Sequence, residues 1–311
     1  MLVRNIPIKP GDRYLIPGDI HFDKQDDEAL DISTRVARER GVNGVILIGD
    51  TFESSGISRH GRPARSFRFG AGTIKAEGNA ARPHLAAWRA LVESARRPER
   101  ARVGGPKRKG PSAPSGKRAE DYVNPKLAAG GEEAGGLYVL TGNHEHWWNG
   151  VQDEYPGLVD TPWYELYGDI FDGWRIFEEH TALRLGPLLV AHGHRLRGSL
   201  ARYSAASVLA NYPGQNTLYG HTHRVDACTT PSQKYGEPVI HGAWTIGHMR
   251  NVPDTLKDTF LGPHADRHQQ GFAIVSFHAV DGEIWFDVEQ ATIHRTLAGT
   301  PFAKVGGEVY F

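Results

Sequence analysis

Short apolar runs alternate with a helix-periodic segment at the start of the chain. Arg13–Pro17 and Gly44–Ile48 have the composition of buried strands, and each run is followed directly by Gly-Asp. Between them, Asp26–Arg40 has apolar residues at helical spacing, acids in its first turn and Gly41 as a C-terminal cap. This order predicts a βαβ unit with a functional site at the carboxyl edge of its sheet.

Later segments extend the same pattern. Leu137–Leu140 is a third apolar run, which leads into Thr-Gly-Asn-His, and Arg82–Arg97 has the apolar stripe of a helix. Further strands are expected at Trp174–Glu178, Pro187–Ala191, Thr217–Tyr219 and Pro238–His241, a hairpin at Gly271–His278 and Glu283–Glu289, and short helices at Pro162–Tyr167 and Ser199–Ala210. The pattern predicts an α/β sandwich of two mixed β-sheets flanked by helices.

The periodic pattern is interrupted between the second and third apolar runs. Ser54–Ala81 is rich in Gly and Arg with little periodicity, and Arg100–Gly136 is rich in Pro, Gly, Ser and Lys, which is typical of a mobile loop. We therefore expect one domain over residues 1–311 that carries a basic, partly flexible insertion at about 55–136.

Charge is distributed unevenly, although Lys+Arg and Asp+Glu both number 36. Arg59–Arg118 contains 16 basic and 3 acidic residues, a net charge of +13, so the remainder carries −13. Such asymmetry indicates either a basic appendage that contacts an anionic partner or a solvated basic loop, and the composition favours neither.

Cysteine content and hydropathy limit the class of protein. Cys228 is the single cysteine, so the sequence has no disulfide framework and no thiolate zinc cluster. The first residues form no secretory apolar region, and no 18-residue apolar stretch occurs. The expectation is a soluble, cytoplasmic protein without membrane contact, and the oligomeric state stays open.

Residues of metal-ligand type follow five of the strand-like segments. Loops at the carboxyl ends of neighbouring strands converge, so these residues are expected to share one pocket. Glycines beside them allow the backbone to approach a metal closely. Mixed carboxylate, imidazole and amide ligands favour Mn, Fe, Zn or Co over Ca or Mg. The five blocks are Asp19-Ile20-His21, Gly49-Asp50, Gly142-Asn143-His144-Glu145, Ala191-His192-Gly193-His194 and Gly220-His221-Thr222-His223.

This ordered set resembles the signature of the calcineurin-like metallophosphoesterases, which is D-x-H, G-D, G-N-H-E/D, H and G-H-x-H. The blocks span Asp19 to His223, about two thirds of the chain. The resemblance implies a metallophosphoesterase-like four-layer sandwich with two divalent ions at the loops that follow its strands. Manganese is the favoured metal, with Fe, Zn, Co or Ni as alternatives.

The resemblance also implies a role for each matching residue. Asp50 would bridge the two ions, and water acidified by both would attack phosphorus in line. His144 would stabilise the transition state or protonate the leaving oxygen. One ion would be bound by Asp19, His21 and His223, and the other by Asn143, His192 and His221.

Several nearby residues have two readings. Glu145 is expected to orient His144 or its loop rather than bind metal, and Glu53 is expected to be structural. His194 is expected to support a neighbouring ligand or to be structural, in preference to binding a metal itself. Trp147 could stack on an aromatic leaving group, but packing is favoured. Arg224 could bind the substrate phosphate or pair with a neighbouring carboxylate.

Three functional readings follow from these observations. The first is a phosphodiesterase that acts on nucleic acid, because Arg89 and Arg96 share a helix face within the basic insertion and could neutralise phosphates. The second is a phosphomonoesterase that acts on a small molecule or a phosphoprotein, with the insertion as a lid. The third is a non-catalytic nucleic-acid-binding scaffold, against which the complete ligand set and His144 argue.

Overall fold

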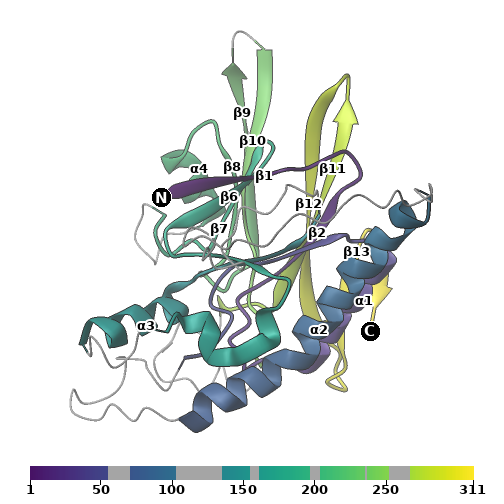
Figure 1. The fold of residues 1–311 in the computed structure, drawn as a ribbon. Coiled ribbons are helices and arrows are strands. Elements are labelled where there is room, and N and C mark those ends of the chain that lie inside the picture. Colours follow the sequence, from purple (N-terminus) through teal and green to yellow (C-terminus); the bar gives the residue numbers. More distant parts are fainter. Residues whose placement is uncertain (55–70, 103–134, 155–160, 197–203, 235–236, 252–266) are drawn as a thin grey trace, which may run out of the picture.

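The computed structural model describes residues 1–311 except 55–70, 103–134, 155–160, 197–203, 235–236 and 252–266. Its strands form two mixed β-sheets (Figure 1). The eight-stranded sheet has the spatial order β14 (Glu308–Tyr310), β13 (Pro301–Val305), β12 (Glu283–Arg295), β11 (Gly271–Val280), β2 (Arg13–Pro17), β3 (Gly44–Leu47), β4 (Leu137–Leu140), β5 (Arg175–Phe177). The six-stranded sheet has the order β1 (Leu2–Ile6), β6 (Thr181–Leu185), β7 (Leu188–Ala191), β8 (Asn216–Tyr219), β10 (Glu237–Thr245), β9 (Asp226–Lys234).

Helices cover the outer faces of this sandwich. The described helices are α1 (Asp27–Glu39), α2 (Ala71–Arg102), α3 (Asn143–Glu154), the 3-10 helix η2 (Trp163–Phe171) and α4 (Ala205–Asn211). Helices α1 and α2 lie side by side over the eight-stranded sheet, and α4 packs on β8, β9 and β10 of the other sheet (Figure 1). The expected α/β class with two mixed sheets is confirmed.

The continuous apolar runs arise because β2, β3 and β4 are buried on both faces. In β3, Val45 and Leu47 join the core beneath α1 and α2, whereas Ile46 joins the core between the two sheets. Successive strand residues point to opposite faces, so a strand that contacts two cores needs apolar residues at every position. These three strands pair in parallel, and their carboxyl ends therefore lie at one edge of the sheet.

Helix α1 matches its expected boundaries closely. The Asp26 carboxylate caps its N-terminus by accepting a hydrogen bond from the Ala29 amide at 3.2 Å. At the other end Gly41 has a φ of +64°, the left-handed conformation that ends many helices. The strands expected at β2 and β4 have the observed bounds, and the expected hairpin is formed by β11 and β12.

The expectations for the insertion need correction where it is described. Helix α2 begins at Ala71 rather than Arg82, so residues 71–81 are helical and not irregular. The apolar stripe expected of a helix is missing there, because the buried position 77 is occupied by a polar residue. Glu77 is buried and accepts a hydrogen bond from the Tyr167 hydroxyl at 2.7 Å. Trp88 is fully buried in the core beneath α1 and α2. The expected mobile loop falls mostly on 103–134, outside the described residues.

Two further differences concern short elements. The segment from Asn143 to Glu154 was expected to begin as a loop but is helix α3. Strands β1, β6, β9, β13 and β14 were not expected. The described part of the helix expected at Ser199–Ala210 is α4.

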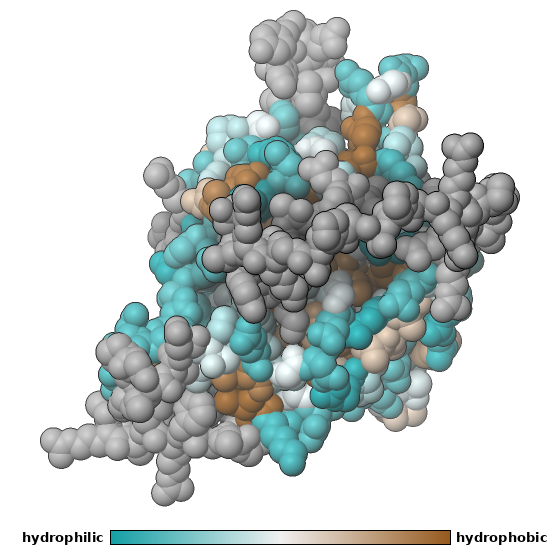
Figure 2. Space-filling model, in the orientation of Figure 1, coloured by the Kyte–Doolittle hydropathy of each residue, from teal (hydrophilic) through white to brown (hydrophobic). Residues whose placement is uncertain are grey.

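The described surface is mainly polar on the face that Figure 2 shows, where hydrophobic residues form small, separate areas. Of the helices in the described ranges, none combines the length and the apolar character needed to cross a membrane.

Candidate metal centre

The five sequence blocks meet at the carboxyl ends of strands from both sheets. Loops after β2, β3 and β4 come from the eight-stranded sheet, and loops after β7 and β8 come from the six-stranded sheet. Among the described residues, three groups have ligand-type atoms that lie within 4.8 Å of one another inside each group. His21, Glu53 and His144 form one of them, and the other two consist entirely of residues from the sequence blocks. Of these two, the first group is Asp19, His21 and His223, and the second is Asp50, His192 and His221.

The first group is compact and buried. His21 Nε2 lies 3.2 Å from His223 Nε2, and His223 Nε2 lies 3.3 Å from Asp19 Oδ2. The same Asp19 oxygen accepts a hydrogen bond from the His221 amide at 2.8 Å, which ties this group to the loop after β8. The three side chains predicted to bind one ion are therefore together.

The second group surrounds His192. Its Nε2 lies 3.3 Å from Asp50 Oδ2 and 3.1 Å from Asn143 Oδ1. Asp50 also reaches the first group, because its carbonyl oxygen accepts a hydrogen bond from the His21 amide at 3.0 Å. Asn143 thus lies beside the group to which it was assigned, and the backbone of Asp50 links the second group to the first.

Glycine is required where the backbone passes the ligands. A Cβ atom at Gly142 or Gly220 would clash with Oδ1 of Asp50 or Asp19, respectively. At Gly49, whose φ is +111°, a Cβ atom would lie 2.7 Å from Nδ1 of His192. These close approaches explain the glycines of the sequence blocks.

Glu145 fixes the loop that carries Asp50. Its buried carboxylate accepts hydrogen bonds from the amides of Asp50, Thr51, Phe52 and Gly142, at 3.1, 2.6, 3.0 and 2.8 Å. The last of these contacts is made within the first turn of α3, in the manner of a capping box. The structure therefore places Glu145 as an orienting residue for the loop.

Helix α3 also directs its N-terminus at the site. The His144 amide donates a hydrogen bond to Asp50 Oδ1 at 2.9 Å. Unpaired amides and the helix dipole favour negative charge at this position. The helix thus helps to hold an ionised carboxylate where two ligand groups meet.

Glu53 holds two of the predicted functional histidines. Its carboxylate lies 3.0 Å from His21 Nδ1, and its backbone carbonyl accepts from His144 Nδ1 at 2.7 Å. Since Nδ1 of His21 faces the Glu53 carboxylate, Nε2 is the ring nitrogen that is available to a metal. His144 Nε2 lies 3.9 Å from Asp50 Oδ2, so the ring presents its other nitrogen to the site.

Burial determines the charge states around the two groups. Burial and neighbouring histidines lower the pKa of His21 to about 4 and that of His221 to about 3, and hold the pKa of His223 well below its usual range. Burial alone would lower the pKa of His192, but Asp50 raises it to about 9. Burial would raise the pKa of Asp50, whereas His192 holds it well below its ordinary value.

These properties fit divalent cations. Neutral imidazoles and ionised carboxylates are the forms that bind metals. The lowered pKa values of His21, His221 and His223 match this form, whereas His192, whose pKa is raised, would have to release a proton to a bound metal. Oδ1 of Asp19 is fully buried and has no hydrogen-bond partner within the described part of the chain, which is costly for a carboxylate oxygen. A cation between Asp19, His21 and His223 would satisfy that oxygen and both facing Nε2 atoms.

The remaining predicted residues are placed as follows. Arg224 follows His223 directly and is half-buried, and its Nε has no hydrogen-bond partner among the described residues. The Trp147 ring packs on His144 with centroids 4.0 Å apart. His194 lies next to the second group, 5.1 Å from His192 between ring centroids, and its Nε2 contacts Glu179 at 3.1 Å.

Two features of this region were not expected from the sequence. Glu179 contacts several histidines and an arginine, yet no motif marks it. The buried His248 lies 5.2 Å from His223 between ring centroids, and its Nδ1 accepts from the Arg250 amide at 3.0 Å. The one indication of these histidine-rich contacts in the sequence is its large number of histidines, 16.

No protein-family model matches the chain, and no curated protein matches it significantly. The case for a function therefore rests on the motifs and on the geometry of this site.

Proposed function

We propose that the protein is a metal-dependent phosphoesterase with a metallophosphoesterase-like four-layer fold. The observation that carries the proposal is the pair of ligand groups, Asp19/His21/His223 and Asp50/His192/His221, which are joined by a backbone hydrogen bond from His21 to Asp50. A carboxylate shared by two cation sites suits phosphate ester chemistry, because two ions can stabilise both the attacking and the leaving oxygen. Manganese is the favoured ion, since the ligand set mixes oxygen and nitrogen donors.

The protein residues have distinct parts in this proposal. Divalent ions bound there would acidify a water molecule and neutralise the charge of the ester. Asp50 holds negative charge between the two groups, and His21 is kept in the ligand tautomer by Glu53. His144, held through Nδ1, presents Nε2 toward the site and can supply a proton to the leaving oxygen.

The described arginines of the insertion bear on the choice of substrate. Arg82 forms an ion pair with Asp169 at 2.8 Å, Arg89 donates to the carbonyl of Ile170 at 3.0 Å, and Arg96 donates to that of Gly135 at 2.8 Å. These three cations attach α2 to the body of the protein. Because these arginines contact the protein itself, they weaken the argument that this face of α2 binds the phosphates of a polynucleotide. The basic insertion alone therefore does not favour a nucleic-acid substrate.

The test is hydrolysis after controlled metal removal. Protein treated with a chelator and then dialysed should release nitrophenolate from bis(p-nitrophenyl) phosphate or p-nitrophenyl phosphate only after Mn²⁺ is returned. Comparison of the two esters separates a diesterase from a monoesterase. If Mn²⁺-loaded, folded protein hydrolyses neither ester nor any phosphorylated nucleotide, the proposal is wrong and the non-catalytic reading replaces it.

A further inference from the structure

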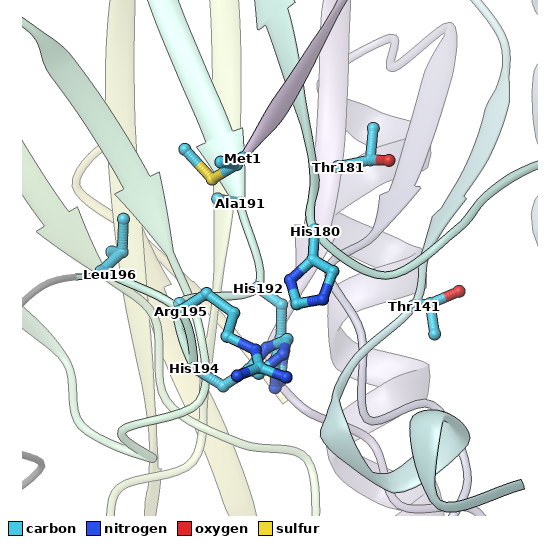
Figure 3. Close-up of a pocket in the computed structure, with 10 residues that line it drawn as sticks. Met1, Thr141, His180, Thr181, Ala191, His192, His194, Arg195 and Leu196 are labelled. Carbon is cyan, nitrogen blue, oxygen red and sulfur yellow. The ribbon is translucent and has the colours of Figure 1, made fainter. Parts of the chain in front are cut away.

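A small pocket opens beside the second ligand group (Figure 3). His192, which belongs to that group, lines the pocket together with His180, His194 and Arg195. Figure 3 shows these four side chains gathered in the centre of the view. A molecule seated there would therefore extend directly from the predicted metal centre.

Glu179 connects the polar residues around the pocket. Its carboxylate lies 3.1 Å from His194 Nε2, 3.0 Å from Arg195 Nη2 and 3.5 Å from His180 Nε2. It also contacts His146 Nδ1 of helix α3. One carboxylate thus holds three imidazoles and one guanidinium that come from separate parts of the chain.

The arrangement has an inner and an outer layer. The Glu179 side chain is 7% exposed, whereas those of His180 and Arg195 are each 51% exposed. A guanidinium has five N–H donors, and the described contact with Glu179 involves Nη2. The buried carboxylate therefore contacts two half-exposed side chains, and the Arg195 guanidinium has further N–H groups beyond the one at Glu179.

The charges select the kind of ligand. A guanidinium fixed at the pocket disfavours a cation, and its planar donors match the oxygens of a phosphate group. His194 Nδ1 is also buried without a hydrogen-bond partner among the described residues, but its Nε2 faces the Glu179 carboxylate, so this nitrogen is not one of the donors. An anion with several oxygens is the ligand that fits these donors.

We propose that this pocket binds a second phosphate group of the substrate, with Arg195 and His180 as its ligands. The inference rests on the proposed function and narrows it to phosphoesters that carry another phosphate on the same molecule. Such a phosphate can belong to a nucleic-acid chain or to a free nucleotide. The chemistry at Arg195 is the same in both cases, and the choice of substrates distinguishes them.

The test compares three substrates in four proteins. Bis(p-nitrophenyl) phosphate has one phosphate, a 5′-phosphorylated thymidine dinucleotide has a chain phosphate, and thymidine 3′,5′-bisphosphate has a free-nucleotide phosphate. The proteins are wild type, Arg195→Gln, His180→Gln and the control Arg4→Gln, which alters an exposed arginine on β1 of the same sheet. The readout is the ratio of kcat/KM for each nucleotide to kcat/KM for the nitrophenyl ester.

A lost hydrogen bond between charged groups should lower that ratio by about 10- to 100-fold in Arg195→Gln, with a smaller loss in His180→Gln. The ratio should not change in Arg4→Gln. A loss for the dinucleotide alone identifies a nucleic-acid chain as the source of the phosphate, and a loss for the bisphosphate alone identifies a free nucleotide. Ratios within twofold of wild type for both nucleotides in both pocket variants would overturn the inference.

A binding arm keeps this test separate from the proposed function. Titration calorimetry of Mn²⁺-loaded protein with inorganic pyrophosphate and with orthophosphate needs no turnover. Wild type should bind pyrophosphate more tightly than orthophosphate, and Arg195→Gln should bind the two with similar affinity. If no ester is hydrolysed but the preference disappears in the variant, the proposed function fails while the phosphate site stands. If Arg195→Gln prefers pyrophosphate over orthophosphate as strongly as wild type does, the proposed phosphate site is wrong.

Discussion

Replacement of Glu145 by Gln tests how firmly the loop of Asp50 is anchored. One carboxylate oxygen accepts from the amides of Thr51 and Phe52, and the other accepts from those of Asp50 and Gly142. A glutamine has a single acceptor oxygen, so two of the four amides would face an NH2 group. Each buried donor left unsatisfied costs about 1–3 kcal/mol, which predicts a loss of about 2–6 kcal/mol.

A second effect of the substitution opposes this loss of stability, so the loss is expected near one end of the range. Burial and the nearby Asp50 raise the pKa of Glu145, so its charge is itself disfavoured in the folded protein. Neutral glutamine removes this repulsion, and we therefore expect a net loss near the lower end, about 2 kcal/mol. The loop of Asp50 should also lose its fixed position, and metal content should fall with it.

The assay is urea unfolding at pH 7 together with elemental analysis of the purified proteins. Glu165→Gln, at an exposed position in η2, is the matched control and should change the free energy of unfolding by less than about 0.5 kcal/mol. The reasoning fails if Glu145→Gln has the unfolding free energy of wild type and retains all of its metal.

Three further predictions concern single side chains. Asp50→Asn should lower the metal content and abolish hydrolysis, because a neutral amide cannot balance two cations; full metal content in this variant would contradict a bridging role. His144→Ala should retain metal but lose about 10²–10⁴-fold in rate, and less with a nitrophenolate leaving group, which needs no proton. A variant that instead lost its metal would be evidence that His144 is a ligand. Burial raises the pKa of Glu77 from 4.5 to about 8, so the folded protein keeps a proton that the unfolded chain loses, and stability should fall as pH rises through this window. Glu77→Gln should flatten this decline in urea unfolding between pH 5 and 8, whereas a decline unchanged from wild type would show that Glu77 is not its source.

The elements that could be predicted are those whose burial determines the pattern of apolar residues in the sequence. Strands β2, β3 and β4 are buried on both faces and are therefore apolar, apart from the exposed Arg13 at the start of β2. By contrast, β1 is an edge strand with four exposed residues, and β9 is an edge strand that contains Pro231. Edge strands contact one neighbour only, so their sequences carry little alternation and tolerate proline.

The same distinction applies to the site. Its ligands follow strands that the sequence marks clearly, and the convergence of their loops within each sheet follows from parallel pairing. The meeting of loops from the two sheets depends on how the sheets pack. Helix α3 was not anticipated because its first residues, Asn143–Glu145, belong to a metal-ligand block that was expected to be a loop. The group around Glu179 was not predictable either, since its members lie on separate segments and only the tertiary structure brings them together.

The backbone of the site indicates what metal binding should do for stability. His21, Asp50, His221 and His223 have φ angles of 55°, 47°, 68° and 54°, in the left-handed region that residues with a side chain rarely adopt. Such conformations cost of the order of 1–3 kcal/mol each and persist only where surrounding contacts impose them. Glu145 and the neighbouring glycines impose them on one side, whereas the facing Nε2 atoms of His21 and His223, 3.2 Å apart, share a single hydrogen bond where a cation would bind both. Ions that bind only the folded chain would offset this strain, so the ligands and the fold are energetically coupled.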